Sequence, residues 1–461
     1  MCGVFGTFGQ TDDATTLLHK GMYQLQHRGQ ETAGAAVTDG KRITVVSGPG
    51  YVSDIISASV LKETRGFAGI GHTRYSTAGG KRRDNAQPMH IDCQHGEIAI
   101  AHNGNLTNEK SLKNVLINDG AIFRSTSDTE VILHLYARAA SSNPAEAIIE
   151  ALNQVKGAYS LLFLTKDSLI AARDPYGFRP LSLGRLENTW FVASETVAFD
   201  IHQAEFVRDI EPGEILVINH DELKSYRINK QEHQTLNCVF EHVYFSRPDS
   251  VVYGQSVEHA REQMGMILAI EQPCQADIVV PVLDSGLFAA QGYSIQSGLP
   301  LKFGLIRNHY VGRSFIQPQQ SERESSVKFK LNPAKRIIEG NRVVLVDDSL
   351  IRGTTSRKII RMIRSAGATE VHLRISGPPT KSACFYGIDT PRSEDLIAFN
   401  KSVEEIRQFI EADSLAYLSL DGLKKAVNDN NNHCFACYTG HYPLQDERQF
   451  VTVERRHRLN P

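Results

Sequence analysis

The stretch VVLVDDSLIRGTTS, residues 343–356, indicates how the C-terminal half of the chain folds. Two acids follow four aliphatic residues, and a glycine then precedes three hydroxyl-bearing residues. Residues 357–366 carry isoleucines and a methionine at the spacing of a buried helical stripe, and Gly367 stands where a helix is expected to end. Residues 370–375 have the composition of a second strand. The pattern predicts a β-α-β unit with a polar loop at the carboxyl end of its first strand, where open α/β sheets bind ligands.

The side chains of this loop suit a phosphorylated ligand. Thr354 and Thr355 offer hydroxyls, and the amides at a helix N-terminus donate to phosphate. Asp347 and Asp348 can take ribose hydroxyls, or a Mg²⁺ ion that bridges to a second anionic group. For an isolated DDS, a helix N-cap with solvated acids is the simpler alternative. The loop is neither a P-loop nor a dinucleotide fingerprint.

The complete stretch resembles the phosphoribosyl-diphosphate (PRPP) loop of type I phosphoribosyltransferases, where hydrophobic residues, two acids and Gly-Thr-Thr follow in this order. The resemblance implies that the loop binds PRPP, with Asp347 and Asp348 also reaching Mg²⁺. It gives as candidate PRPP ligands Asp347, Asp348, Ser349, Arg352, Gly353, Thr354 and Thr355.

Length and composition describe a globular protein with more than one domain. The chain has 461 residues, 41% hydrophobic residues and a net charge of −2, without the basic excess expected of a nucleic-acid-binding protein. No apolar run approaches the roughly 20 residues of a membrane span, and we expect a cytoplasmic protein. Seven cysteines, an odd number, argue against a secreted disulfide framework and favour reactive or metal-binding roles for some of them.

Cys2 is a candidate nucleophile. Methionine before a small residue is normally removed, which leaves Cys2 with an α-amine of pKa about 8 that can serve as the base for its own thiol. A lone cysteine at position two is usually incidental. The motifs that follow favour the catalytic interpretation; they are QHRGQE at 26–31, GHTRYST at 71–77, NAQP at 85–88, AHNGN at 101–105 and SDTE at 127–130.

In this order the motifs resemble the class II glutamine amidotransferase domain, which implies an N-terminal-nucleophile hydrolase with a four-layer αββα fold. Cys2 then attacks the side-chain amide of glutamine, while Asn103 and Gly104 stabilise the oxyanion. Arg74 binds the α-carboxylate as a bidentate fork, and Asp128 receives the α-ammonium. An N-cap role for Asp128 is an alternative that does not exclude the first.

The polar stretch at 219–234 ends the first domain, and we place the two domains at 2–230 and 231–461. The string VFEHVYFSRPDS at 239–250 resembles the entry to the synthase domain of amidophosphoribosyltransferases, and we interpret RDPYGFRPL at 173–181 as a turn. The string LDSG at 283–286 takes the place of the pyrophosphate loop, where the resemblance makes Ser285 a residue that helps place the metal-bound diphosphate. Leu283 departs from the family's usual proline but removes no ligand.

Residues 307–333 form a long polar stretch that on its own indicates a disordered surface loop. The resemblance makes it a lid over PRPP, with Arg323 and Lys330 as phosphate contacts. Closure of such a lid excludes water from an oxocarbenium-like ribose.

Four cysteines suggest a metal centre. Cys434 and Cys437 form a CxxC that by itself fits a redox pair, half of a zinc site, or neither. With Cys238 and Cys384 they resemble the ligands of the iron–sulfur branch of the family, where four thiolates hold a [4Fe–4S] cluster. Zinc and free thiols are the alternatives. We expect the cluster to be structural or an oxygen-sensitive switch rather than catalytic, and Cys93 and Cys274 to be ordinary buried residues.

Nearly the whole chain thus resembles the amidophosphoribosyltransferase family. The resemblance implies that glutamine, PRPP and water give 5-phosphoribosylamine, pyrophosphate and glutamate, the first committed step of purine biosynthesis. Ammonia would pass between the two sites through an apolar passage, and Tyr75, beside Arg74, would couple glutamine binding to it. The resemblance also implies one Mg²⁺ and one cluster per subunit, feedback by purine nucleotides, and a homodimer or homotetramer.

Two other functions compete with this one. The same glutaminase is joined to a sugar-phosphate isomerase in glucosamine-6-phosphate synthase, but the loop at 347–356 argues against that pairing. A PRPP-sensing regulator without catalysis is the other. The intact set of Cys2, Arg74, Asn103 and Asp128 argues against it.

Overall fold

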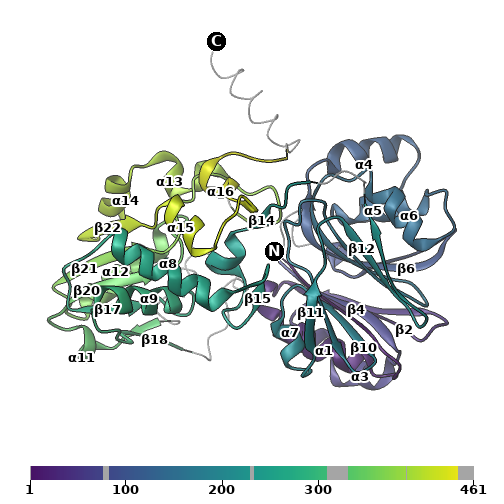
Figure 1. The fold of residues 1–461 in the computed structure, drawn as a ribbon, viewed down its shortest axis with the longest axis horizontal. Coiled ribbons are helices and arrows are strands. Elements are labelled where there is room, and N and C mark those ends of the chain that lie inside the picture. The colour runs from purple at the N-terminus through teal and green to yellow at the C-terminus, as the bar shows by residue number, and fades with distance from the viewer. Residues whose placement is uncertain (1, 76–82, 229–232, 309–330, 391, 445–461) are drawn as a thin grey trace, which may run out of the picture.

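The chain forms an N-terminal half and a C-terminal half that lie side by side (Figure 1). The computed structural model describes residues 2–75, 83–228, 233–308, 331–390 and 392–444. Two packed antiparallel sheets make up the first half and a parallel sheet with helices makes up the second. The predicted fold classes, αββα followed by α/β, are therefore confirmed.

The N-terminal half is built on two sheets. The seven-stranded sheet has the order β11-β9-β10-β1-β4-β2-β3. Its strands are β1 Gly3–Phe8, β2 Thr32–Thr38, β3 Ile43–Pro49, β4 Ala68–Arg74, β9 Ser182–Leu186, β10 Thr189–Ala193 and β11 Glu205–Asp209. The six-stranded sheet has the order β13-β12-β8-β7-β6-β5. Its strands are β5 Met89–Cys93, β6 Gly96–Leu106, β7 Gly157–Leu164, β8 Leu169–Arg173, β12 Glu214–Ile218 and β13 Leu223–Arg227.

The helices of this half cover the outer faces of the two sheets. One group packs on the seven-stranded sheet: α1 Ala14–Gln24, α2 Val52–Ile55, α3 Ala58–Glu63 and α7 Val197–Asp200. The other group packs on the six-stranded sheet: α4 Glu109–Asn118, α5 Thr129–Ala137 and α6 Pro144–Leu152. Between the sheets, Val4 and Ile70 of one meet Ala101 and Leu162 of the other in a shared core. These three hydrophobic layers produce the four-layer arrangement.

The C-terminal half is built on the parallel sheet β17-β20-β21-β22. Its strands are β17 Ile278–Pro281, β20 Arg342–Asp347, β21 Glu370–Ile375 and β22 Ser414–Tyr417. Its helices are α8 Val257–Glu271, α9 Leu287–Ser297, α11 Lys335–Ile338, α12 Thr354–Ser365, α13 Ile397–Asn400, α14 Val403–Ile410, α15 Leu420–Ala426 and α16 Ala436–Thr439. The described part of this half also contains three short strand pairs: β14 Asn237–Cys238 with β23 His433–Cys434, β15 Val251–Val252 with β16 Gln255–Ser256, and β18 Leu305–Arg307 with β19 Leu331–Pro333.

Both faces of this parallel sheet are buried, as its uninterrupted aliphatic strands predict. On β20, Val343 and Leu345 point to the side covered by α11, α12, α13 and α14. Val344 and Val346 point to the opposite side, covered by α8, α9, α15 and α16. Because side chains alternate along a strand, the four aliphatic residues serve both cores, and the acids after them emerge at the sheet edge.

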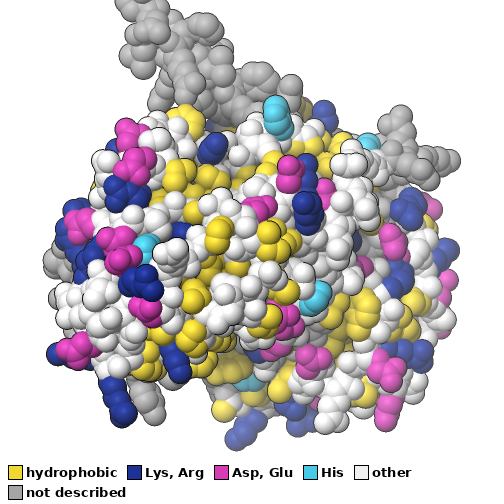
Figure 2. Space-filling view, turned by 60° about the vertical axis from the view of Figure 1, so that its left-hand side comes forward, with side chains coloured by type: hydrophobic (Ala, Val, Ile, Leu, Met, Phe, Trp, Pro, Cys, Tyr) yellow, Lys and Arg dark blue, Asp and Glu magenta, His cyan; other side chains and the backbone are white. Residues whose placement is uncertain are grey.

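The surface carries both signs of charge. Figure 2 shows Lys and Arg side chains intermingled with Asp and Glu across the face in view, with small apolar areas between them. None of the helices in the described part of the chain is both long and apolar enough to cross a membrane.

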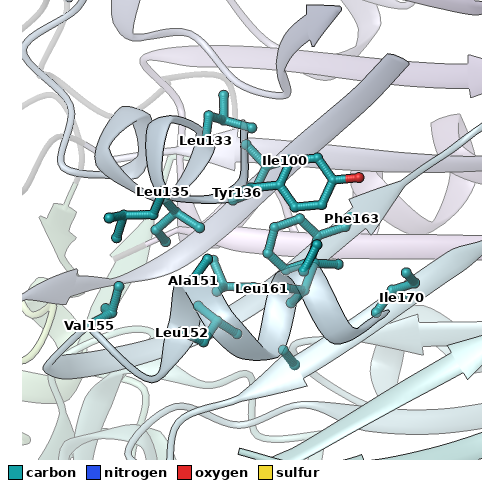
Figure 3. Close-up of a cluster of buried hydrophobic side chains, with 14 of the residues drawn as sticks. Ile100, Leu133, Leu135, Tyr136, Ala151, Leu152, Val155, Leu161, Phe163 and Ile170 are labelled. Atoms are coloured by element: carbon teal, nitrogen blue, oxygen red, sulfur yellow. The ribbon is translucent and has the colours of Figure 1, made fainter. Parts of the chain in front are cut away.

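The outer core of the six-stranded sheet illustrates how the N-terminal half is stabilised (Figure 3). Leu133 and Tyr136 of α5 and Leu152 of α6 lie fully or almost fully buried against Leu161 and Phe163 of β7. Burying side chains of this size contributes roughly 1.5–3 kcal/mol each before conformational entropy is subtracted. The resulting rigid support lies beneath β6, the strand that carries Asn103 and Gly104.

Candidate active sites

The amide of Asn103 faces Cys2, the predicted nucleophile. The backbone nitrogen of Cys2 lies 3.2 Å from Oδ1 of Asn103, and the buried Cys2 thiol lies 3.6 Å from the carbonyl oxygen of Tyr75. Nδ2 of Asn103 is buried and has no hydrogen-bond partner among the described residues. The structure thus brings together Cys2, Asn103 and Tyr75, and it orients an amide donor that is available for a substrate oxygen.

Gly104 follows Asn103 in a conformation and an environment that require glycine. Its φ is +159°, and a Cβ added there would lie 2.0 Å from the carbonyl oxygen of Ala158 on the adjacent strand. Any side chain would therefore push β6 away from β7. The predicted oxyanion pair lies on a strand whose position is tightly fixed.

The two predicted glutamine-binding residues are both buried on the same half. Arg74 is the last residue of β4 and is 4% exposed, whereas Asp128 is 7% exposed. Asp128 occupies the N-cap position of α5, but its side chain makes no cap hydrogen bond. Its Oδ2 instead accepts from the backbone nitrogen of Leu106 at 2.9 Å. Asp128 therefore has the position of a helix N-cap, but its side chain does not form the hydrogen bond of one.

Four residues for which the sequence predicted no role support this site. Oε1 of Gln87 accepts from the backbone nitrogen of His102 at 2.7 Å, and Nδ1 of His102 lies 3.0 Å from Oγ1 of Thr129. Burial lowers the pKa of His102, so its ring is neutral. Arg28 donates from Nε to the carbonyl oxygen of Cys2 at 2.9 Å. Gln87 lies in the NAQP motif and Arg28 in the QHRGQE motif, but neither motif indicates which residue these side chains contact.

The predicted PRPP loop connects β20 to α12 at the carboxyl edge of the parallel sheet. Asp348 is buried and Asp347 is half-buried, and within the described residues neither forms a salt bridge. Burial and the charge of Asp348 together raise the pKa of Asp347 well above its ordinary value. Ser349 donates from Oγ to Asp348 at 2.6 Å. Two adjacent carboxylates at a strand end that form no salt bridge within the described residues are a fitting site for Mg²⁺ or ribose hydroxyls.

Gly353 sets the start of α12 with a φ of +74°. The helix begins at Thr354, three residues earlier than the spacing of its apolar stripe predicts. Thr354 and Thr355 therefore belong to its first turn and are exposed, as is Arg352 just before it. The exposed hydroxyls and the helix N-terminus are available to an anionic ligand.

The predicted pyrophosphate loop lies beside the PRPP loop. Strand β17 pairs with β20 up to the register Pro281↔Val346, and the backbone nitrogen of Val282 donates to Val346 at 2.9 Å. Ser285 is half-buried in the turn that follows, and Asp284 forms an ion pair with Arg307. The two loops thus share one edge of the sheet. Lys330, Arg323 and most of the expected lid lie outside the described residues.

Four free cysteines line one pocket. Cys238 of β14 is in direct register with Cys434 of β23, Cys437 lies in α16, and Cys384 lies in the loop after β21. The remaining lining includes Arg179 and the aromatic rings of Phe178, Phe240 and Tyr386. Burial and the neighbouring thiols raise the pKa of Cys434 and Cys437. Within the described residues, no three His, Cys, Asp or Glu side chains could hold one metal ion.

The other two cysteines lie elsewhere. Cys93 ends β5 and Cys274 follows α8, and both are half-buried against hydrophobic clusters. Neither lines the four-cysteine pocket.

Comparisons with known proteins agree with this two-site arrangement. A model of the glutamine amidotransferase domain matches residues 72–200, and a model of the phosphoribosyl transferase domain matches residues 265–395. An amidophosphoribosyltransferase of Bacillus subtilis is 47% identical over 96% of this chain and 94% of its own length. The chain belongs to the amidophosphoribosyltransferase family. Members of the family make 5-phosphoribosylamine, pyrophosphate and glutamate from PRPP, glutamine and water, and the chain catalyses this first step of purine biosynthesis.

Other members are similarly close. Amidophosphoribosyltransferase of Methanocaldococcus jannaschii is 48% identical over 96% of this chain and 98% of its own length, and the chloroplastic amidophosphoribosyltransferase 1 of Arabidopsis thaliana is 48% identical over 96% and 79%. A solved structure of the B. subtilis PRPP amidotransferase, complexed with ADP and GMP, has a TM-score of 0.90 at 47% identity and covers 96% of this chain and 97% of that chain. The family assignment therefore rests on the whole chain.

Proposed function

We propose that Cys2 releases ammonia from glutamine and that the loop at 347–355 binds the PRPP that receives it. The observation that carries this proposal is the amide of Asn103, whose Oδ1 lies at the nitrogen of Cys2 and whose buried Nδ2 lacks a partner. A donor held in that way beside a thiol suits an oxyanion that forms as the thiol attacks. Gly104 supplies the adjacent backbone amide.

The roles of the remaining residues follow from charge. Arg74 binds the α-carboxylate of glutamine and Asp128 its α-ammonium, so that simple amides are excluded. The α-amine of Cys2, once the methionine is removed, takes the thiol proton and returns it to the departing ammonia. Tyr75, whose carbonyl oxygen lies at the thiol, couples glutamine binding to the passage of ammonia.

At the second site, pyrophosphate leaves ribose as ammonia attacks. Asp347 and Asp348 would hold ribose hydroxyls and Mg²⁺, and Ser285 would help place the diphosphate. Lys330, which lies outside the described residues, is the further residue expected to contact phosphate. Ser349, Arg352, Gly353, Thr354 and Thr355 bind the 5-phosphate and the rest of PRPP through side chains and amides of the first turn of α12. Mg²⁺ held by these residues would supply positive charge to the leaving pyrophosphate. The raised pKa of Asp347 supports a cation site, because a bound cation relieves the repulsion between the two carboxylates.

We propose that Cys238, Cys384, Cys434 and Cys437 hold a [4Fe–4S] cluster. All four line one pocket, whose walls also contain the aromatic rings of Phe178, Phe240 and Tyr386. Arg179 lines the same pocket, and its charge interacts with Cys238 and Cys384, so it can offset part of the negative charge of four thiolates. Four thiolates are the usual ligands of a [4Fe–4S] cluster, and zinc is the alternative metal for the same ligand set.

Metal analysis tests the cluster. Anaerobically purified protein should contain about four iron and four sulfide per chain, and Cys434→Ser should lose them. Cys93→Ser, a half-buried cysteine outside the pocket, is the matched control and should keep them. Bound zinc, or no metal in the parent protein, would refute the assignment.

Several wider properties belong to the same proposal. The domain boundary at 230/231 is supported by β13, which still belongs to the six-stranded sheet, and by β14, which pairs with β23 of the other half. We expect purine nucleotides to inhibit, since the B. subtilis enzyme was solved with ADP and GMP. We also expect a homodimer or homotetramer in the cytoplasm without nucleic-acid or membrane partners, although the plant relatives are named chloroplastic.

One assay tests the two-site proposal. Anaerobically purified protein given glutamine, PRPP and Mg²⁺ should release pyrophosphate and glutamate in equal amounts. A glucosamine-6-phosphate synthase or a PRPP sensor without catalytic activity would release no pyrophosphate from PRPP. Absence of PRPP-dependent pyrophosphate release would therefore refute the proposal.

A further inference from the structure

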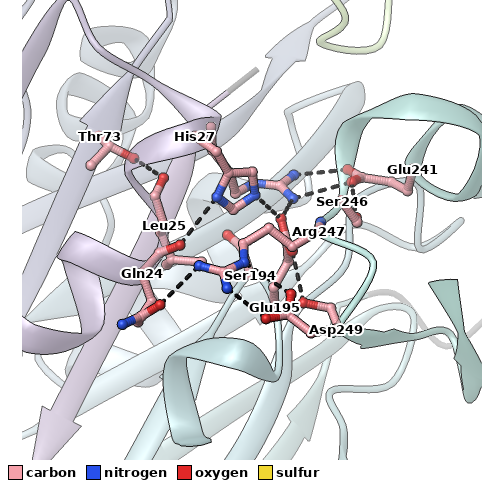
Figure 4. Close-up of polar contacts among 12 residues, drawn as sticks. Gln24, Leu25, His27, Thr73, Ser194, Glu195, Glu241, Ser246, Arg247 and Asp249 are labelled. Carbon is pink, nitrogen blue, oxygen red and sulfur yellow. Dashed lines mark hydrogen bonds and ion pairs between the residues drawn. The ribbon is translucent and has the colours of Figure 1, made fainter. Parts of the chain in front are cut away.

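A buried network of charges connects the backbone of Cys2 to the other half of the chain. Figure 4 shows part of it, with His27 and Glu195 on one side and Glu241 and Ser246 on the other. Arg28 donates from Nε to the carbonyl oxygen of Cys2 at 2.9 Å. Its two terminal nitrogens donate to both oxygens of Glu241, at 2.8 and 3.1 Å, and one of them also donates to Glu195. The side chains of Arg28, Glu195 and Glu241 are 0% exposed. One guanidinium thus joins the backbone of Cys2 to a carboxylate 213 residues away.

Both oxygens of the Glu241 carboxylate accept hydrogen bonds. Besides Arg28, it accepts from Oγ of Ser246 at 2.6 Å and from Nη1 of Arg179 at 3.3 Å. Burial acts against its charge, but Arg28 and Arg179 lower its pKa below the ordinary value. Glu241 therefore stays ionised, and its bidentate pairing fixes the plane of the Arg28 guanidinium.

The second carboxylate, Glu195, holds the same guanidinium from the N-terminal half. Nε2 of His27 lies 2.7 Å from Oε1 of Glu195, and Oε2 accepts from the backbone nitrogen of Arg247 at 2.9 Å and from Ser250 at 2.8 Å. Burial would raise the pKa of Glu195, yet His27 and Arg28 hold it well below the ordinary value. The carboxylates of Glu195 and Glu241 are thus paired with His27, Arg28 and Arg179.

The hydrogen bond from Arg28 helps to fix the position of Cys2. Two side chains hold its backbone, Asn103 at the nitrogen and Arg28 at the carbonyl oxygen. The carbonyl oxygen and the nitrogen together set the direction of the Cα–Cβ bond and hence the position of the thiol. A displacement of about 1 Å in a reacting group costs on the order of 10²-fold in rate.

We propose that Glu241 is a positioning residue for the glutaminase nucleophile and acts on Cys2 through Arg28. The residue comes from the entry string of the C-terminal half, so the half that binds PRPP contributes to the geometry of the half that hydrolyses glutamine. The inference rests on the proposed role of Cys2. Neither Arg28 nor Glu241 belongs to the PRPP loops, so their effect is confined to the use of glutamine.

The test is the full-length variant Glu241→Gln, which keeps the shape of the side chain and removes the charge. We expect kcat for glutamine hydrolysis to fall about 10- to 100-fold because the thiol is misplaced. The KM for glutamine should change by less than about threefold, because uniform binding is kept. The ammonia-dependent synthesis of phosphoribosylamine should stay within about twofold of the parent rate, because its machinery is untouched.

The ammonia-dependent rate also reports how much of each preparation is folded. Asp249→Asn is the matched control, since Asp249 pairs with Arg247 at the same boundary but is 48% exposed and does not contact Arg28. It should leave both rates unchanged. If Glu241→Gln yields no folded protein, Ser246→Ala removes one donor to Glu241 and should give the same selective loss on a smaller scale.

Two results would overturn the inference. The first is an unchanged kcat for glutamine hydrolysis in folded Glu241→Gln. The second is a parallel fall of the glutamine- and ammonia-dependent rates, which a merely structural role predicts. If neither reaction exists in the parent protein, the proposed function fails instead, so the two failures are distinguishable.

Discussion

Asn103 accepts from the backbone nitrogen of Cys2 with its amide oxygen, and its buried amide nitrogen has no hydrogen-bond partner among the described residues. The residue types of this site could be predicted, because Cys2 at the chain start and the AHNGN string are local patterns. The partners of Arg28 could not be predicted. Glu195 and Glu241 lie 167 and 213 residues away, and no local pattern connects a buried arginine to carboxylates at that separation.

Asn103→Ala tests the oxyanion role. Loss of one preorganised donor should lower kcat for glutamine hydrolysis about 10²- to 10³-fold. The KM for glutamine should change little, because Arg74 and Asp128 remain. The measurement is glutamate release at saturating glutamine, with the ammonia-dependent rate as control. A loss seen only in KM would assign Asn103 to binding instead.

Asp347→Asn tests the cation site by opposing effects on stability and activity. Because the folded-state pKa of Asp347 is raised, ionising it destabilises the Mg²⁺-free protein, and stability falls as pH rises through that raised pKa. The substitution should therefore raise the Tm of Mg²⁺-free protein at neutral pH. It should lower PRPP-dependent turnover on the order of 10²-fold or more, since metal stabilisation of the leaving group amounts to several kcal/mol.

Asp277→Asn is the control, because this substitution should change Tm in the opposite direction. Hydrogen bonds and charge from Arg342, at the start of β20, lower the pKa of Asp277 to about 2. Its contribution to stability is present above the ordinary pKa of about 4 and is lost as pH falls through the lower one. Asp277→Asn should lower Tm at neutral pH and leave the stabilisation by Mg²⁺ unchanged. Equal Tm shifts in the two variants would contradict the account.

At the scale of elements, the β-α-β unit was predicted correctly because its apolar pattern is unambiguous. The strand Glu370–Ile375 has the predicted bounds, whereas α12 starts three residues early. The early start has a physical cause, since Gly353 in a left-handed conformation lets the helix begin directly after it. Strand β22 was missed, because Ser414–Tyr417 is only four residues long and is recognised by its pairing with β21.

Gly353→Ala tests the shape of the PRPP loop. A side chain at a φ of +74° costs roughly 1–2 kcal/mol, and here the Cβ would also lie 2.9 Å from Ile397 and 3.1 Å from Phe409. The loop should shift and the KM for PRPP should rise about tenfold, equivalent to roughly 1.4 kcal/mol. Gly340→Ala is the matched control, with a φ of +78° and no atom within 4 Å. It should lose similar stability but keep the KM for PRPP, and an equal change in both would contradict a specific role of the loop.

At the scale of the whole molecule, the two halves meet at the nucleophile site. Nδ2 of Asn105 donates to the carbonyl oxygen of Phe385 at 2.9 Å, and a Cβ on Gly387 would lie 3.1 Å from Cα of Gly104. The segment that carries Cys384 therefore packs directly on β6, the strand of Asn103 and Gly104. Such contacts could not be predicted from the sequence, because they depend on how two separately recognisable domains dock.

We expect this arrangement to make the geometry of the proposed glutaminase site depend on the other half, while each half keeps its own chemistry. Arg179 belongs to the network around Glu241 and also lines the four-cysteine pocket. The string 173–181, which the sequence indicated as a turn, thus places the guanidinium of Arg179 between Glu241 and the four-cysteine pocket. We therefore expect substitutions where the two halves meet to lower the glutamine-dependent rate more than the ammonia-dependent rate.

The central claim is that one chain contains an ammonia source at Cys2 and a separate PRPP site that accepts ammonia. Cys2→Ala removes the nucleophile without touching either loop of the parallel sheet. The most direct measurement is PRPP-dependent pyrophosphate release by full-length Cys2→Ala, made once with glutamine and once with ammonia. The account predicts no detectable rate with glutamine and a rate with ammonia within about twofold of the parent. Loss of both rates in folded protein would contradict two separate sites, and retention of the glutamine-dependent rate would contradict the role of Cys2.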